Sequence, residues 1–181
     1  MILFLNLADP CDIAITEIAS GNKKALERVY NEYGRMILSV AYQITGDFGE
    51  AEDVLQDTMI RILRLSHTYK KGTNPKAWVL KVTRNSAVDK IKEKKHTLSL
   101  EEISEKEKAQ SAFEPQTLQQ IMLRDALNTL SDEEKLIVKL RIYAGLSHSE
   151  IANVIEKNTV SVRKKYQRAL EKLKNYCEGG R

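Results

Sequence analysis

Apolar residues recur at the three-and-four spacing of an amphipathic helix along most of the chain, and strand-like alternation is missing. Gly21-Asn22 opens a long first helix, and Gly46 ends it as a C-terminal glycine does. A second helix is expected over residues 50–65. Asn74-Pro75, an N-cap followed by a first-turn proline, starts a third that reaches about Lys95. This pattern predicts one helical domain before the middle of the chain.

The last third of the chain carries the strongest local signal. Ser131 and Ser147 each stand three residues before a glutamate, which makes two capping boxes. They begin helices expected over residues 131–144 and 148–155, and Asn158 caps a longer basic helix. Two short helices followed by a basic one at this spacing predict a helix-turn-helix.

Between these blocks, residues 97–114 lack a sustained apolar stripe and are mainly acidic, so we predict a flexible linker there. The expected fold class is all-α. It has two small helical domains, residues 1–96 and 115–181, of which the second is the helix-turn-helix. A hydrophobic content of 42% and a charged content of 30% fit such a globular, water-soluble protein.

The net charge of +4 is small, but its distribution is uneven. Residues 47–57 hold five acidic side chains and no Lys or Arg. Residues 61–95 hold eleven basic side chains against two acidic ones, and residues 157–174 hold seven against Glu171 alone. Two basic blocks indicate phosphate contacts at two places. Solvated helix faces are the alternative interpretation.

Targeting and metal signals are missing. Residues 1–7 are apolar but too short to span a bilayer, so no membrane insertion is expected. Cys11 and Cys177 lie near opposite ends, which argues against a disulfide framework or a zinc site and favours a cytoplasmic location. The three histidines are scattered, at positions 67, 96 and 148, and are expected to be surface or packing residues. No metal or cofactor is expected.

The final helix divides into two faces at about 100° per residue. Its expected buried stripe is Val162, Tyr166, Ala169, Leu170 and Leu173. The opposite face and its flanks hold Val160, Ser161, Arg163, Lys164, Lys165, Gln167 and Arg168. Arg, Lys and Gln side chains suit reading of base edges in the major groove. An ordinary amphipathic surface helix is the alternative.

The second helix has a mixed outer face. Its core stripe is expected to be Ala51, Val54, Leu55, Thr58, Ile62 and Leu65. The opposite side gathers Glu52, Asp53, Gln56, Ile60 and Leu63. Aliphatic residues among acids are typical of a protein-binding patch. Alternatively, Ile60 and Leu63 pack on a neighbouring helix of their own domain.

On the third helix, a ladder of polar residues follows a single tryptophan. It consists of Trp78, Lys81, Asn85, Asp89 and Lys92, with Arg84 to one side. A Trp at the head of such a ladder could stack on bases. A lone Trp in the core of the domain is the alternative.

Four segments together resemble a family. They are GNKKALERVYNEYGRMILSVAYQITGD, AEDVLQDTMIRIL, PKAWVLKVTRNSAVD and GLSHSEIANVIEKNTVSVRKKYQRALEKL. In this order they are similar to the extracytoplasmic-function (group IV) sigma factors of bacterial RNA polymerase. The first three resemble sigma region two and the last resembles sigma region four, with no region-three domain between them.

The resemblance implies a role for each candidate residue. Glu52, Asp53, Gln56 and Asp57, with Ile60 and Leu63, would dock on core RNA polymerase. The loop 67–74, through Lys70, Lys71, Thr73 and Asn74, would hold an extruded base of the −10 element. Trp78, Lys81, Arg84 and Asn85 would read and help to melt that element, and the outer face of the final helix would read the −35 element. The implied partners are core polymerase, promoter DNA and an anti-sigma factor.

The chain departs from the family in the turn of the helix-turn-helix. Glu156 stands where the family usually has Gly, and Asn158-Thr159-Val160 replaces a more typical Ser-x-Gly. Because of both departures, we expect the recognition helix to be placed slightly differently from that of the family.

Two other functions are weighed against this one. A conventional helix-turn-helix regulator would share the last third, but it offers no reason for the AEDVLQD and AWVLKVTRN helices. A metal-dependent nucleic-acid enzyme could use Glu50, Glu52, Asp53 and Asp57 as magnesium ligands. On a helix, however, Glu52 and Asp53 diverge by about 100°. We therefore predict a promoter-directing subunit without catalytic residues.

Overall fold

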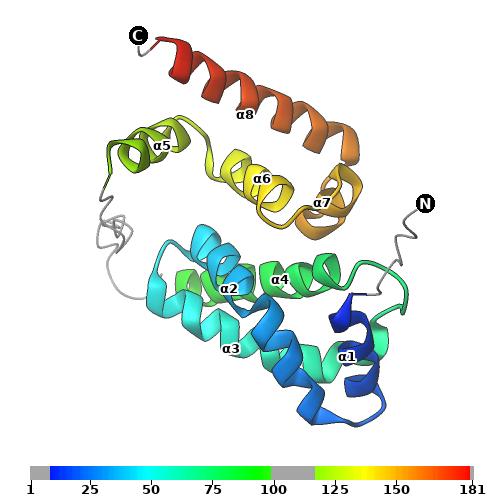
Figure 1. The fold of residues 1–181 in the computed structure, drawn as a ribbon. Coiled ribbons are helices and arrows are strands. Elements are labelled where there is room, and N and C mark those ends of the chain that lie inside the picture. Colours follow the sequence, from blue (N-terminus) through cyan, green and yellow to red (C-terminus); the bar gives the residue numbers. More distant parts are fainter. Residues whose placement is uncertain (1–8, 99–116, 180–181) are drawn as a thin grey trace, which may run out of the picture.

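The computed structural model describes residues 9–98 and 117–179, and every regular element within them is a helix (Figure 1). The first half (residues 9–98) contains α1 (Pro10–Ala19), α2 (Leu26–Thr45), α3 (Phe48–Leu65) and α4 (Pro75–Leu98). The second half (residues 117–179) contains α5 (Leu118–Asn128), α6 (Asp132–Ile142), α7 (His148–Ile155) and α8 (Thr159–Gly179). Short 3₁₀ turns, Lys23–Ala25 and Ser66–Thr68, precede α2 and follow α3. The all-α class is confirmed.

The predicted helix ends are present as side-chain caps. Ser131 and Ser147 both form complete capping boxes at the starts of α6 and α7. The Asn158 side chain accepts a hydrogen bond from the Ser161 N–H at 2.9 Å. Gly46 ends α2 with φ 75°. Of the predicted linker, residues 99–114 lie outside the described residues, while 97 and 98 belong to α4.

Helix α1 was not predicted, although its signal is in the sequence. Asp9 caps it by accepting a hydrogen bond from the Cys11 N–H at 3.0 Å, and Pro10 occupies its first turn. This is the same N-cap and proline pair that correctly predicted the start of α4. The Tyr33 hydroxyl of α2 donates to the other Asp9 carboxylate oxygen at 2.5 Å and so ties α1 to the domain.

The first half packs α1, α3 and α4 around α2. Ile15, Val29, Tyr33, Ile37 and Ile62 are all buried in one cluster there. Ion pairs lace α3 to α4 on the surface: Arg61 with Asp89 at 2.7 Å, Asp53 with Lys90 at 2.9 Å, and Glu50 with Lys94. These pairs hold the polymerase-docking helix predicted from the sequence against the predicted −10 helix.

In the second half, α8 packs on α5, α6 and α7. Val162 and Ala169 are buried, and Tyr166 and Leu173 are half-buried, as the stripe predicted. Two leucines expected in buried stripes are instead exposed, Leu65 by 39% and Leu170 by 40%. Leu65 is the last residue of α3, and Leu170 is turned by about 100° from the buried Ala169 to the margin of its stripe.

One hydrophobic cluster spans both halves, which the sequence did not predict. Val40 of α2 and Leu80 of α4 are both 0% exposed, and they belong to the same buried cluster as Leu140 and Ile151 of the second half. Helix α4 lies along α7, and α2 lies along α6 (Figure 1). The Lys139 ammonium of α6 donates to the Ser39 carbonyl of α2 at 3.0 Å, and burial lowers its pKa. The predicted domains are therefore packed together.

The C-cap of α7 yields a stability prediction. Glu156 has φ 55° and ψ 47°, the left-handed conformation in which a side chain is strained and glycine is not. We expect Glu156→Gly to be more stable than Glu156→Ala by about 1 kcal/mol, measured as the free energy of unfolding in urea. Both variants lose the Glu156 carboxylate, so their difference isolates the backbone. Equal stabilities would contradict this explanation.

Candidate polymerase and DNA interface

The outer face of α8 is open to solvent. Val160 is 62% exposed, and Arg163, Lys164, Gln167 and Arg168 are all exposed as well. The buried Val162 and Ala169 fix this orientation by packing the opposite side of α8 into the second half. The structure thus brings most of the predicted −35 residues together on one accessible face.

Lys165 and Ser161 are placed differently from the rest of that set. The Lys165 ammonium forms an ion pair with Glu133 of α6, and the residue is half-buried. Ser161 is also half-buried, at the capped first turn. Lys165 therefore joins two helices of the second half, so the free basic face consists of Arg163, Lys164 and Arg168.

His148 is a packing residue, as expected. Its ring contacts that of Tyr166 edge-on, with centroids 5.3 Å apart, and so joins the start of α7 to α8. Burial, together with Arg141 and Arg163, lowers the pKa of the imidazole. A neutral ring therefore supports the helix-turn-helix.

The loop before α4 presents three of its four predicted side chains to solvent. Lys70, Lys71 and Thr73 are exposed. The loop turns sharply because the Thr73 N–H donates to the Lys70 carbonyl at 3.1 Å and Gly72 adopts φ 80°. A positive φ at the third position of such a turn is typical of type II, which favours glycine there. Asp12 of α1 also contacts this loop, although no motif in the sequence marks it as a functional residue.

Trp78 is turned towards the protein. It is half-buried and packs against the core of the first half, with its ring edge-on to Tyr69 at 5.5 Å between centroids. The structure therefore favours the alternative of a packing Trp over a free stacking surface. Asn85, two turns further along α4, is half-buried and accepts a hydrogen bond from Arg84 at 3.1 Å.

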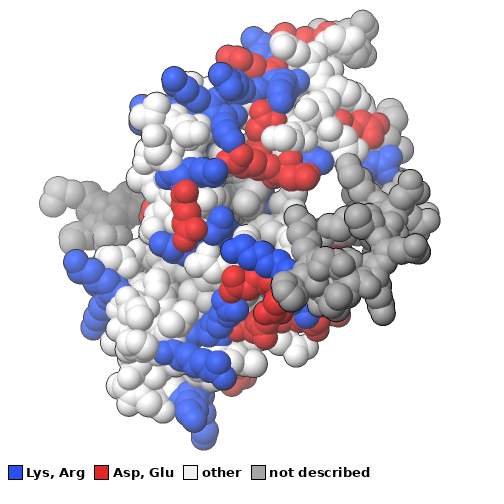
Figure 2. Space-filling view, turned by 180° about the vertical axis from the view of Figure 1, so that it is seen from behind, with Lys and Arg blue, Asp and Glu red and all other residues white. Residues whose placement is uncertain are grey.

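Three predicted −10 residues are bonded to the second half. Asn74 donates to Glu150 at 2.7 Å, and the Lys81 ammonium donates to the Asn153 side chain at 2.9 Å. Arg84 forms an ion pair with Glu156 at 2.8 Å. All three acceptors belong to α7 or its C-cap, so the helix-turn-helix covers the polar side of α4. Figure 2 shows basic and acidic side chains next to one another across the middle of the molecule.

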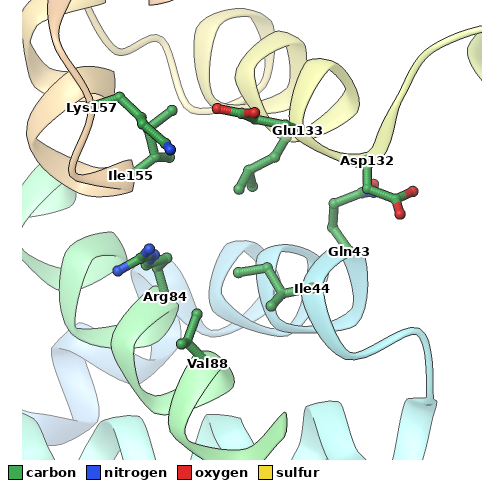
Figure 3. Close-up of a pocket in the computed structure, with 9 residues that line it drawn as sticks. Gln43, Ile44, Arg84, Val88, Asp132, Glu133, Ile155 and Lys157 are labelled. Atoms are coloured by element: carbon green, nitrogen blue, oxygen red, sulfur yellow. The ribbon is translucent and has the colours of Figure 1, made fainter. Parts of the chain in front are cut away.

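A cavity of about 260 Å³ lies in the junction between the halves. Figure 3 shows Arg84 of α4 below Ile155 and Lys157, with Asp132 and Glu133 across from them. Its remaining lining residues are Gln43, Ile44, Val88 and Leu136. The two halves are therefore not packed against each other at this part of the junction.

The predicted docking face on α3 is mostly exposed. Glu52, Asp53, Gln56 and Asp57 all lie on the surface. Ile60 is 47% exposed among them. Leu63 instead packs, half-buried, against the core of the first half. Leu63 therefore packs within its own domain, as the alternative interpretation expected. Ile60 lies on the surface among the acidic residues, as a protein-binding patch requires.

Two of the four acidic residues considered as magnesium ligands form ion pairs with lysines of α4. Glu50 and Asp53 pair with Lys94 and Lys90, which pull the two carboxylates towards α4. Within residues 9–98 and 117–179, no three His, Cys, Asp or Glu side chains form a group that could hold a metal ion. None of the helices described there combines the length and apolar character needed to cross a bilayer.

Comparison with known proteins finds relatives for both halves. The family model for sigma-70 region 2 matches residues 29–97, and the model for sigma-70 region 4 matches residues 120–173. The ECF RNA polymerase sigma factor BldN of Streptomyces coelicolor is 28% identical over 160 residues, which are 85% of this chain and 61% of BldN. The ECF sigma factor SigL of Mycobacterium tuberculosis is 25% identical, over 84% of this chain and 89% of SigL. The chain thus spans less than two thirds of BldN but most of SigL.

Two solved structures share the fold at 19% sequence identity. CnrH, solved in complex with the cytosolic domain of CnrY, superposes with a TM-score of 0.68 over 94% of this chain and 99% of CnrH. The sigma factor RpoE of Bartonella quintana, solved with the anti-sigma factor NepR, gives a TM-score of 0.67 over 87% of this chain and 99% of RpoE.

The exposed face of α8 yields a prediction about duplex DNA. Lys164→Ala or Arg168→Ala should weaken binding to the preferred duplex by about 1–3 kcal/mol and relax preference at one base. Lys165→Ala is the matched control, because that ammonium faces Glu133, and it should leave base preference unchanged. Binding measured on a set of single-base variants tests this. Equal weakening of Lys164→Ala on every sequence, with a shallower salt dependence, would make Lys164 a phosphate contact instead.

Proposed function

The chain belongs to the extracytoplasmic-function sigma factors of bacterial RNA polymerase, and we propose from this that it directs core polymerase to particular promoters and helps to open their −10 element. The observation that carries the proposal is the occurrence of region 2 and region 4 in one chain, with a free basic face on the recognition helix of the second. A regulator that acts without being a polymerase subunit has no use for region 2.

The proposed tasks fall on different surfaces. Helix α8 reads the −35 duplex through Arg163, Lys164, Gln167 and Arg168. Helix α3 docks on core polymerase through its exposed acidic face and Ile60. The loop 67–74 and the polar side of α4 capture the −10 strand. An anti-sigma factor is a further proposed partner, since RpoE of Bartonella quintana, which has the same fold, was solved with one.

The proposed mechanism converts binding energy into strand opening. Taking a base out of the stack costs a few kcal/mol, and holding that base in the loop repays part of the cost. The exposed Lys70 and Lys71 would attract the phosphates on either side of it. The chain makes and breaks no covalent bond in this scheme, because core polymerase carries out the chemistry in the cytoplasm.

Run-off transcription with core polymerase on genomic fragments tests this function. The protein should give discrete start sites that core polymerase alone does not use. Asp53→Arg combined with Gln56→Ala should reduce both the transcripts and the affinity for core polymerase, because it reverses charge on the docking face. Lys90→Ala is the control, since it breaks the same Asp53 ion pair and leaves that face acidic.

Two outcomes would count against the proposal. The absence of any promoter-specific transcript would contradict the function itself. An unchanged affinity of the folded double variant for core polymerase would remove the docking face from α3 and leave the function standing. The exposed Asp53–Lys90 pair is worth about 1 kcal/mol or less, so neither variant should unfold the domain.

We propose in addition that the packed arrangement is a resting state that must open. Asn74, Lys81 and Arg84 are each bonded to α7 or its C-cap, so DNA must compete with these bonds to contact them. Uncovering Val40 and Leu80 would cost about 3–6 kcal/mol, at roughly 1.5–3 kcal/mol for each buried side chain. Separation also uncovers apolar side chains of the second half in the same cluster, such as Leu140 and Ile151, which adds to this cost. A nanomolar complex with polymerase would correspond to about 12 kcal/mol, a free energy of the same order.

Weakening the junction from the second half should therefore help the −10 strand to bind. Asn153→Ala with Glu156→Gly removes two acceptors and leaves every residue of α4 in place. We expect the free protein to bind a single-stranded −10 oligonucleotide about two- to tenfold more tightly for each contact removed. Asn175→Ala with Glu171→Ala removes similar groups from the exposed surface of α8 and should have no effect. Unchanged affinity in a variant with an increased hydrodynamic radius would show that closure does not cover the site.

A further inference from the structure

A carboxylate on the N-terminal helix holds the loop that precedes α4. Asp12 is 6% exposed. One of its oxygens, Oδ1, accepts a hydrogen bond from the Tyr69 hydroxyl at 2.5 Å and another from the Gly72 N–H at 2.9 Å. Asp12 and the loop are far apart in the sequence, and the end of α1 lies beside the turn that follows α3 (Figure 1).

These two bonds act on both sides of the exposed lysines. Tyr69 stands before Lys70 and Lys71, and Gly72 follows them, so Asp12 fixes the two ends of the segment that carries both cations. The bond to Gly72 is made by its backbone, at the one position where the loop needs a left-handed φ. Displacing that N–H would therefore alter the turn itself.

The remaining bonds of the loop are local. The Tyr69 N–H donates to the Ser66 carbonyl, and the Thr73 N–H and hydroxyl both donate to the Lys70 carbonyl. Among the described residues, the helix to which residues 69–73 are hydrogen-bonded is α1, through Asp12. The Tyr69 ring adds its edge-on contact with Trp78 of α4. Asp12 therefore links the loop to the rest of the first half.

The chemistry of the group suits this task. The bonds from Tyr69 and Gly72, with the nearby Lys71, lower the pKa of the Asp12 carboxyl below its ordinary value. A charged acceptor makes shorter and stronger hydrogen bonds than a neutral one. The region 2 match begins at residue 29, so this anchor comes from a helix that precedes the matched segment.

We propose that Asp12, acting through Tyr69 and Gly72, is a positioning residue that sets which −10 base the loop accepts. The inference rests on the proposed function of the loop. A base held between side chains on a turn is selected by where that turn places them, and a displacement of a fraction of an ångström changes hydrogen bonds that depend steeply on distance and angle. Asp12 does not need to touch DNA for this effect.

The test compares base preference in holoenzymes. Tyr69→Phe keeps the ring that contacts Trp78 but removes the hydroxyl, which lies 2.5 Å from Asp12 Oδ1 and 3.0 Å from the Thr73 carbonyl. Asp12→Ala removes both bonds to Asp12 and leaves the Tyr69–Thr73 contact in place. Initiation is measured on a promoter set with all four bases at each −10 position. We expect the ratio of the preferred to the other bases to fall about two- to tenfold for each hydrogen bond removed, in Asp12→Ala as well as in Tyr69→Phe.

A matched control separates positioning from stability. Tyr33→Phe removes a tyrosine–aspartate hydrogen bond of the same 2.5 Å length, to Asp9 at the N-cap of the same helix, and leaves both bonds between Asp12 and the loop in place. It should lower stability by a similar amount and leave the base ratio unchanged. Amide exchange of residues 69–73 adds a structural readout, which should become faster in Tyr69→Phe and Asp12→Ala and not in Tyr33→Phe.

Replacing residues 70–74 by a foreign loop separates the role of Asp12 from the proposed function of the loop itself. If that replacement changes the preferred base while Tyr69→Phe and Asp12→Ala keep the wild-type ratio, the role of Asp12 is wrong and the sigma function stands. An equal loss of preference in Tyr33→Phe would also overturn it. Failure of the wild-type holoenzyme to initiate at any promoter would instead contradict the proposed function.

Discussion

The contact between α4 and α7 is the interaction on which the state of the whole molecule depends. It combines a buried apolar layer, which includes Leu80 of α4, and polar bonds from Lys81 and Arg84 at its surface. Because it covers one DNA-facing side and leaves α8 exposed, the two proposed DNA contacts are not equally available. On the proposed assignment, the free protein offers its −35 face to duplex DNA while its −10 side is bonded to its own second half.

The polar part of this contact is easier to break than the apolar part. The Arg84–Glu156 pair is partly exposed, and pairs of this kind contribute little to stability in water. Lys139, half-buried beside the Ser39 carbonyl, carries a desolvation cost that its lowered pKa reflects. The junction also contains an open pocket of about 260 Å³. These features suit the proposed opening if binding to polymerase outweighs the cost of exposing the aliphatic side chains on both halves.

Local signals in the sequence predicted local structure well. The capping boxes at Ser131 and Ser147 and the glycine at position 46 mark helix ends through contacts within a few residues. Contacts between distant segments were not predictable in this way. Helical periodicity does not show that Lys81 contacts Asn153, or that Asp12 contacts Gly72. Both contacts arise only when whole helices pack together. From the sequence, Lys165 was predicted to lie on the DNA-facing side with Lys164 and Arg168. Its ion pair with Glu133 of α6 instead orients its side chain towards the second half. The turn at Glu156 has the left-handed conformation that the family's glycine would adopt, so this departure leaves the geometry of the C-cap intact.

Distances between spin labels on the two halves test the central claim, that promoter opening requires the halves to separate. Labels at the exposed Lys92 of α4 and Glu171 of α8, in a Cys177→Ser background, avoid the proposed binding residues and the buried Cys11. The free protein should give one short distance distribution. Holoenzyme on an open promoter should give a longer distribution that does not overlap it. The same short distribution in both states would contradict the account, because α4 would then read the −10 strand while still packed on α7.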